Sequence, residues 1–323
     1  MEKSGSYASI YAEDNSIPFV DGAMPDIVLT TGAFDEWEYL TDGNNTILTA
    51  YLGTSTEILI PKEIDGKKVI GVKKALLDSS RDEITSVVIE AELTSLPDNF
   101  FSGFNNLESV VLPDFMTDMG SYTFSECIQL QNVHLPSVLT EIRDFAFSNC
   151  LQLEDIEIPF TVKEVYDEWG TQIYGGIRGE TISGCSSLRR VKLPAGLVSI
   201  PNGFFSECTS LKNITIPETV KYINASAFYG CGSLSSIKLP ESLTKIGESA
   251  FQDCLPLINL SLNSSVTNIG KNAFKGDPFL ILSCINNDYA VSYAQENNLL
   301  YATVEMTKKS VTATLEQDVL SNM

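Results

Sequence analysis

The stretch "FAFSNCLQLEDIEIPFTV" (residues 145–162) contains the pattern that decides the fold. Phe147 is followed by Cys150 three residues later, by Leu153 six residues later and by Pro159 twelve residues later. Between the leucine and the proline, alternate residues are aliphatic, which is the period of two expected for a short strand with one buried face. The same order recurs along most of the chain, so the internal repeat is measured first.

The repeat has an almost constant length. Its anchor positions are Phe101, Phe124, Phe147, Ile182, Phe205, Phe228, Phe251 and Phe274, which are 23 residues apart in every step except one of 35 residues. Each unit offers one short strand, a turn and a second bend, and none could bury its apolar side alone. Stacked units would cover one another's apolar edges. The sequence therefore predicts a mainly β solenoid with 23-residue coils and short 3₁₀ or α turns.

Six of the seven cysteines occupy one position of the repeat, three residues after the anchor. They are Cys127, Cys150, Cys185, Cys208, Cys231 and Cys254. Stacked coils would place these side chains in parallel, a poor geometry for disulfides. One cysteine per coil also cannot converge on a metal. We therefore expect small buried hydrophobic side chains, and expect Cys284, which is outside this position, in the end cap.

The pattern changes at both ends of the chain. We expect an extended lead-in over 1–36, the solenoid with its caps over 37–304, and a tail without a clear core pattern over 305–323. Asp42 to Asn45 separate two alternating runs in "EYLTDGNNTILTAYLG" (38–53), which predicts an N-terminal hairpin cap. Asp288 precedes an amphipathic segment, which predicts a short capped helix at the C-terminal end.

One unit carries twelve extra residues, located between Val165 and Ile182 in the insertion "YDEWGTQIYGGIRGET" (166–181). Its candidate ligand-binding residues are Tyr166, Trp169, Tyr174 and Arg178. Aromatic side chains with a polar group on a protruding loop are common binding anchors. The alternative is a loop that folds back and buries Trp169 against the solenoid.

The charge of the chain opposes binding to nucleic acid. It has 21 basic and 42 acidic residues, a net charge of −21, which would repel a phosphate backbone. No run approaches the length of a membrane span. The first twenty residues lack the basic and apolar regions of a signal peptide, which is compatible with a cytosolic protein or with a mature secreted chain.

The sequence gives little support for catalysis. The single histidine, His134, falls at an outward strand position, and no G-x-S-x-G, P-loop or H-E-x-x-H motif is present. No cofactor or metal is expected. Surface acids such as Asp155 and Glu157 leave a glycan-acting enzyme as an alternative.

The outward strand positions would form a continuous exposed sheet face. Successive coils place Asp155 and Glu157 beside Arg190 and Lys192, so opposite charges should pair across the strands. Such pairing is either purely structural or part of a polar docking face. The candidate ligand-binding residues on this face are His134, Asp155, Glu157, Arg190 and Lys192.

The repeat unit "AFxxCxxLxxIxLPxxVxxIgxxAF" resembles the leucine-rich repeats of the BspA type, seen most fully in "AFYGCGSLSSIKLPESLTKIGESAF" (227–251). The resemblance implies a secreted or surface-attached protein of mouth or gut bacteria, with no catalytic motif to transfer. It implies adhesion to a host or neighbouring-cell protein or glycan. A purely structural spacer is a further alternative.

Overall fold

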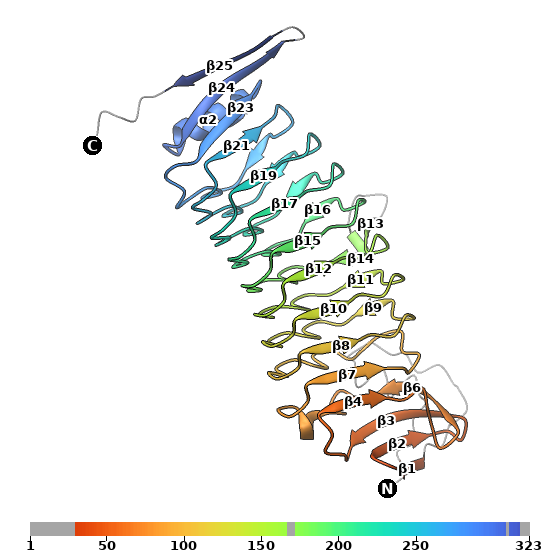
Figure 1. Cartoon of the computed structure of the whole chain (residues 1–323). Coiled ribbons are helices and arrows are strands. Elements are labelled where there is room, and N and C mark those ends of the chain that lie inside the picture. Colours follow the sequence, from red (N-terminus) through yellow and green to blue (C-terminus); the bar gives the residue numbers. More distant parts are fainter. Residues whose placement is uncertain (1–29, 167–171, 308–309, 317–323) are drawn as a thin grey trace.

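The computed structural model describes residues 30–166, 172–307 and 310–316. These residues form a solenoid whose coils stack along one axis, from an N-terminal mixed sheet to a C-terminal helix and hairpin (Figure 1). The fold predicted from the repeat is confirmed.

One side of the stack carries one strand from each coil. Where neighbouring strands are hydrogen-bonded they pair in parallel, because every coil returns to the same side of the stack. Within each strand the outward residues alternate with inward residues that enter the core. The strands are β4 (Glu57–Ile60), β7 (Ser86–Ile89), β8 (Ser109–Val111), β10 (Asn132–His134), β12 (Asp155–Glu157), β15 (Arg190–Lys192), β17 (Asn213–Thr215), β19 (Ser236–Lys238), β21 (Asn259–Leu262) and β23 (Ile281–Ile285).

The second bend of each coil also forms a strand, whereas the sequence predicted only a bend. In β11, for example, Ile142 is buried and pairs in parallel with Met119 of β9. Two residues per coil suffice for a ladder when the stacking of the coils fixes their register. The strands of this second ladder are β9 (Asp118–Met119), β11 (Glu141–Ile142), β14 (Gln172–Ile177), β16 (Ser199–Ile200), β18 (Tyr222–Ile223), β20 (Lys245–Ile246) and β22 (Asn268–Ile269).

The anchor side chains form stacks in the core. The ring centroids of Phe124 and Phe147 are 5.3 Å apart, with an angle of 11° between the ring planes. Those of Phe228 and Phe251 are 5.1 Å apart, with nearly parallel planes. Ile182, which replaces the aromatic residue in the longer unit, is also fully buried. The constant 23-residue step thus places equivalent side chains directly on one another.

All seven cysteines are free and buried, which confirms the prediction for the six at the repeat position; Cys284 lies in β23 near the C-terminal end of the stack. The sequence did not predict their hydrogen bonds. Cys150 donates its S–H to the carbonyl of Phe124 (3.1 Å) and Cys254 to that of Phe228 (3.1 Å), each an anchor of the preceding coil. The other four members of the ladder, Cys127, Cys185, Cys208 and Cys231, make the equivalent bond at 3.0–3.3 Å. The thiols therefore fill space and also satisfy buried carbonyl oxygens.

The N-terminal end is closed by a five-stranded sheet in the order β1-β2-β3-β6-β5. The strands are β1 (Thr30–Phe34), β2 (Trp37–Thr41), β3 (Asn45–Tyr51), β5 (Glu63–Ile64) and β6 (Lys67–Val72). The predicted hairpin is present between β2 and β3, and Asp42 accepts the backbone N–H groups of Asn44 and Asn45 in its turn. The short 3₁₀ helix η1 (Asp78–Ser80) follows.

The structure differs from the sequence prediction near both ends. β1 falls in the segment expected to be a lead-in, and pairs with β2 over five residues. β24 (Leu300–Thr307) begins within the predicted solenoid range and forms an antiparallel hairpin with β25 (Ser310–Glu316), which lies in the segment expected to be a tail. In β25, Val311, Ala313 and Leu315 alternate with polar residues, which is the period of two that is typical of a strand.

The predicted C-terminal helix is α2 (Asp288–Glu296), but its cap is Asn287 rather than Asp288. The Asn287 side chain accepts the backbone N–H of Ala290 (2.9 Å) and donates to the carbonyl of Val266 (2.9 Å). Tyr293 of α2 packs edge-on against Phe274, so the helix covers the last anchor.

Candidate interaction surface

The outward side chains of β4, β7, β8, β10, β12 and β15 form one continuous surface, called the sheet face below. Each of these strands buries the side chains that alternate with its outward ones. Outward residues are aligned in register along β4, β7, β8 and β10 and again between β12 and β15, and β10 and β12 are in contact where the two groups meet. The sheet face can therefore be described row by row.

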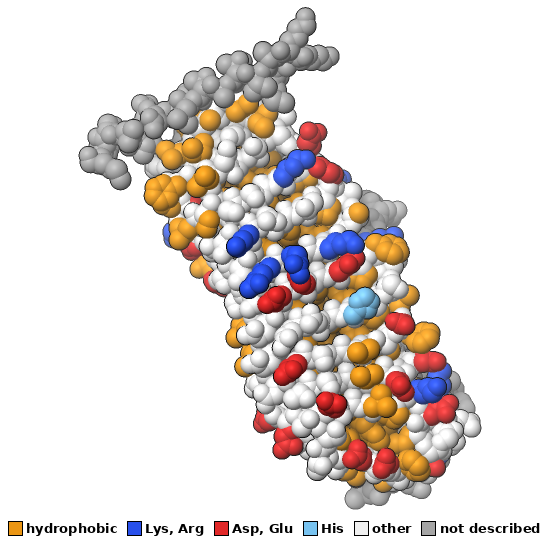
Figure 2. Space-filling view, in the orientation of Figure 1, with side chains coloured by type: hydrophobic (Ala, Val, Ile, Leu, Met, Phe, Trp, Pro, Cys, Tyr) orange, Lys and Arg blue, Asp and Glu red, His pale blue; other side chains and the backbone are white. Residues whose placement is uncertain are grey.

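Three aliphatic side chains form an apolar row on the sheet face. Leu59, Val88 and Val111 are 49%, 38% and 55% exposed, and each is the direct neighbour of the next across the strands. Val111 is in turn paired with His134. Figure 2 shows this apolar strip extending from the lower end of the molecule toward its single histidine.

The sequence analysis missed the apolar row. Its signal was an aliphatic residue at the third, outward position of β8, where the later strands carry polar residues such as Thr215. Removing these apolar side chains from water is favourable, and contiguous exposed apolar surface is a mark of interaction sites.

The predicted charge pairs across β12 and β15 are confirmed. Asp155 is aligned with Arg190 and Glu157 with Lys192, and both pairs form ion pairs. The two cations are 79% and 72% exposed. Exposed pairs of this kind contribute about 0.2–1 kcal/mol, so the four side chains can exchange partners at little cost.

A groove with a volume of about 390 Å³ lies where β10, β12 and β15 end. Among its lining residues are His134, Ser137, Glu157, Phe160 and Lys192. Phe160 follows Pro159 in the turn and is 77% exposed, the highest value among the large hydrophobic side chains of the described residues. The groove brings together three of the predicted residues and adds Phe160, which the sequence analysis did not identify.

The insertion forms a hairpin on the second ladder. β13 (Glu164–Tyr166) pairs antiparallel with β14, and Ile177 of β14 pairs in parallel with Ile142 of β11. Tyr166 and Tyr174 lie in these paired strands. Trp169 lies outside the described residues, so both interpretations of its side chain stay predictions.

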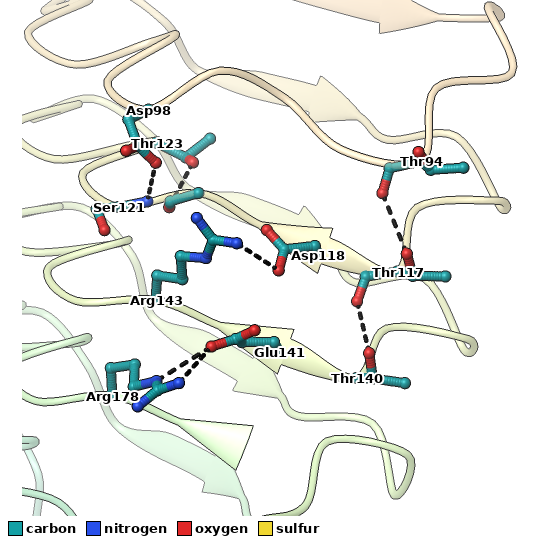
Figure 3. Close-up of polar contacts among 11 residues, drawn as sticks. Thr94, Asp98, Thr117, Asp118, Ser121, Thr123, Thr140, Glu141, Arg143 and Arg178 are labelled. Atoms are coloured by element: carbon teal, nitrogen blue, oxygen red, sulfur yellow. Dashed lines mark hydrogen bonds and ion pairs between the residues drawn. The ribbon is translucent and has the colours of Figure 1, made fainter. Parts of the chain in front are cut away.

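Arg178 directly follows β14 and so lies away from the five candidate residues of the sheet face. Its guanidinium donates twice to Glu141, at 2.8 and 3.1 Å, and the neighbouring coil repeats the arrangement with Arg143 and Asp118 at 3.1 Å (Figure 3). Burial raises the pKa of Asp118 to about 6; the neighbouring Glu141 adds to the rise and Arg143 opposes it.

A raised carboxyl pKa beside a second carboxyl occurs at catalytic sites and also in structural networks. Here Asp118 and Glu141 are aligned neighbours on β9 and β11, and each is bound by its own arginine. The four side chains thus form two ion pairs that link three successive coils.

Within the described ranges, no three or more His, Cys, Asp or Glu side chains are grouped so that they could hold a metal ion. Over the same residues, no helix has the length and apolar character needed to cross a membrane.

Comparison with known proteins places these features in a family. The chain matches the family described as "BspA type Leucine rich repeat region" over residues 78–169 and 176–294, more than half of its length. A comparison with curated proteins found no match.

Several solved structures are similar to the chain. A leucine-rich repeat protein from Bacteroides ovatus ATCC 8483 is 25% identical, with a TM-score of 0.66 over 83% of this chain and 66% of that one. The chain thus spans slightly less than two thirds of that structure. A leucine rich cell surface protein from Faecalibacterium prausnitzii A2-165 is 18% identical, with a TM-score of 0.46 over 90% and 96% of the two chains. The pneumococcal vaccine antigen PcpA is 18% identical, with a TM-score of 0.49 over 79% and 81%. The matched family covers the coils from η1 to α2, and the chain belongs to the BspA-type leucine-rich repeat family.

Proposed function

We propose that this protein is a noncatalytic scaffold that binds another protein through its sheet face, outside a bacterial cell. The family is one of surface proteins whose repeats generally serve as interaction scaffolds. The observation that carries the proposal is the apolar row of Leu59, Val88 and Val111, which is exposed on a rigid sheet and continues through His134 to the groove beside Phe160.

The charges around the apolar row favour one kind of partner. Exposed acidic residues precede or follow its strands, namely Glu57, Glu90, Glu108 and Asp114. Interfaces commonly combine an apolar centre with a polar rim of complementary charge. The partner that fits is therefore a protein surface with an apolar centre and basic residues around it.

The glycan-acting enzyme is less well supported. Such an enzyme needs two carboxyl groups facing each other across a substrate, one of them with a raised pKa. Asp155 and Glu157 are instead outward neighbours on one strand, each ion-paired to the next coil. The groove is lined by Glu157 and not by Asp155.

The proposal is tested with two matched double variants. Val88→Asn with Val111→Asn replaces two side chains of the apolar row with polar ones. Asparagine is chosen because the fold already accepts it at an outward position, that of Asn132 in β10. Thr215→Asn with Ser236→Asn makes polar changes at outward positions of β17 and β19. Wild type and both variants are immobilised, and binding is measured for host-surface proteins captured by the wild type.

We expect binding at least about tenfold weaker for the apolar-row variant, because two buried contacts at an interface centre contribute more than about 1.4 kcal/mol. The β17–β19 variant should bind like the wild type. Equal binding by all three proteins would refute the sheet face as the site. Loss of binding after enzymatic removal of glycans from the partner would show that the scaffold recognises a glycan and not a protein surface.

A further inference from the structure

The last coil departs from the cysteine ladder at one position. Three residues after its anchor Phe274 stands Asp277, where the preceding coils carry cysteine. In the coil before it, the thiol of Cys254 donates to the carbonyl of Phe228, the anchor one coil earlier. The same spacing of 26 residues relates residue 277 to the carbonyl of Phe251.

Asp277 is enclosed and lacks hydrogen-bond partners. The residue is 4% exposed, and both of its carboxyl oxygens are inaccessible to water and make no hydrogen bond. An ionised carboxylate in such surroundings is very unfavourable, whereas a protonated one carries an O–H donor. A protonated Asp277 is therefore the chemical equivalent of the thiol that it replaces.

The charged groups around Asp277 disfavour its ionised form. Burial, together with the smaller effect of the Asp253 carboxylate on the preceding coil, raises its pKa to about 7. The backbone N–H of Cys254 offsets part of this rise. Asp277 lines a cavity of about 480 Å³ together with Lys275 of the same turn and Tyr293 of α2, but neither of these two side chains donates a hydrogen bond to its carboxyl group.

Both carboxyl oxygens of Asp277 are inaccessible from that cavity, so it is not a binding site for a cation at this residue. We propose that Asp277 is a pH-sensitive contact: its protonated carboxyl donates to the Phe251 carbonyl and holds the last coil and α2 on the stack, and loss of that proton loosens this end. The proposal does not depend on the sheet face.

The direction of the pH effect follows from linkage. The pKa of Asp277 rises from the ordinary 3.8 to about 7 on folding, so between these values the folded chain holds a proton that the unfolded chain has lost. The contribution of Asp277 to stability is therefore present at low pH, falls as the pH rises through this window, and stays lost above about 7.

The test compares wild type with Asp277→Asn, which is neutral at every pH and keeps an N–H donor. Melting temperatures are measured from about pH 4.5 to about 8.5, a range that covers most of the window and its upper end. The variant's melting temperature relative to wild type should increase by several degrees up to about pH 7 and then level off. A difference that does not change with pH, or one that falls as pH rises, would overturn the proposal.

Asp253→Asn supplies a second, independent variant. Asp253 has a left-handed φ of 61°, a conformation that asparagine adopts readily, so the fold should be kept. Removing its charge should move the pH-dependent loss of stability to lower pH without abolishing it. Hydrogen exchange, corrected for the intrinsic rate, should show the pH-dependent loss of amide protection in residues 271–287 and not in the N-terminal sheet. An unshifted transition, or a change spread over the whole chain, would contradict the contact.

Discussion

At the scale of single residues, the cysteine ladder links the repeat to its hydrogen bonds. Each of the six thiols donates to the anchor carbonyl one coil earlier, 26 residues back or 38 where the insertion intervenes. Burial raises the pKa of Cys127 to about 12, so this thiol stays protonated and keeps its donor across the physiological range.

Substitution of Cys150 tests whether its hydrogen bond contributes to stability. Cys150→Ala removes both the sulfur and the donor to Phe124, and should lower the free energy of unfolding by roughly 1–3 kcal/mol. Cys150→Ser keeps an O–H donor for the same carbonyl, so it should cost less than the alanine variant. Urea denaturation of the three proteins measures both effects. An alanine variant more stable than the serine variant would show that the thiol only fills space.

The sequence allowed the burial of the thiols to be predicted, because their position in the repeat is regular. Their acceptors could not be predicted, since the path of the backbone between Phe124 and Cys150 decides which carbonyl is reachable. Likewise, the pairing of Asp155 with Arg190 follows from register alone, whereas Phe160 depends on a turn that directs its side chain outward.

At the scale of the elements, each coil turns at two left-handed positions on either side of its anchor. Phe145 (φ 58°) and Asn149 (φ 60°) flank Phe147 in this way. Asparagine adopts this conformation readily, but phenylalanine does not. The rings of Tyr122 and Phe145 stack at 4.8 Å across two coils, a contact that compensates for the backbone strain. Glycine or asparagine marks some of these positions, such as Gly230 and Asn272, but no local turn signal marks Phe145.

The close approach of successive coils makes a prediction about two glycines. A Cβ at Gly247 would lie 2.5 Å from the backbone nitrogen of Ala225 on the preceding coil, whereas one at Gly196 would meet nothing within 4 Å. Gly247→Ala should therefore lower the free energy of unfolding by roughly 1–3 kcal/mol, because backbone must move. Gly196→Ala should change it little or raise it slightly. Equal effects in urea denaturation would show that the coils are less closely stacked than described.

At the scale of the whole molecule, the strict 23-residue step allowed the solenoid to be predicted, since only stacking buries every unit. The same step did not predict β1 or β25, which lie outside the repeat and belong to the sheets that close the two ends. The apolar row was missed for a related reason. A repeat pattern emphasises what the units share, while a binding surface depends on where they differ, as at Val111.

The central claim is that the sheet face around the apolar row is the surface that partners contact. Footprinting of side chains by radical labelling, with and without a captured partner, tests it most directly. We expect protection of Leu59, Val88, Val111 and Phe160, while Tyr222, Leu255 and Phe279, which are exposed elsewhere, stay labelled. Protection of the second group with full labelling of the first would contradict the account.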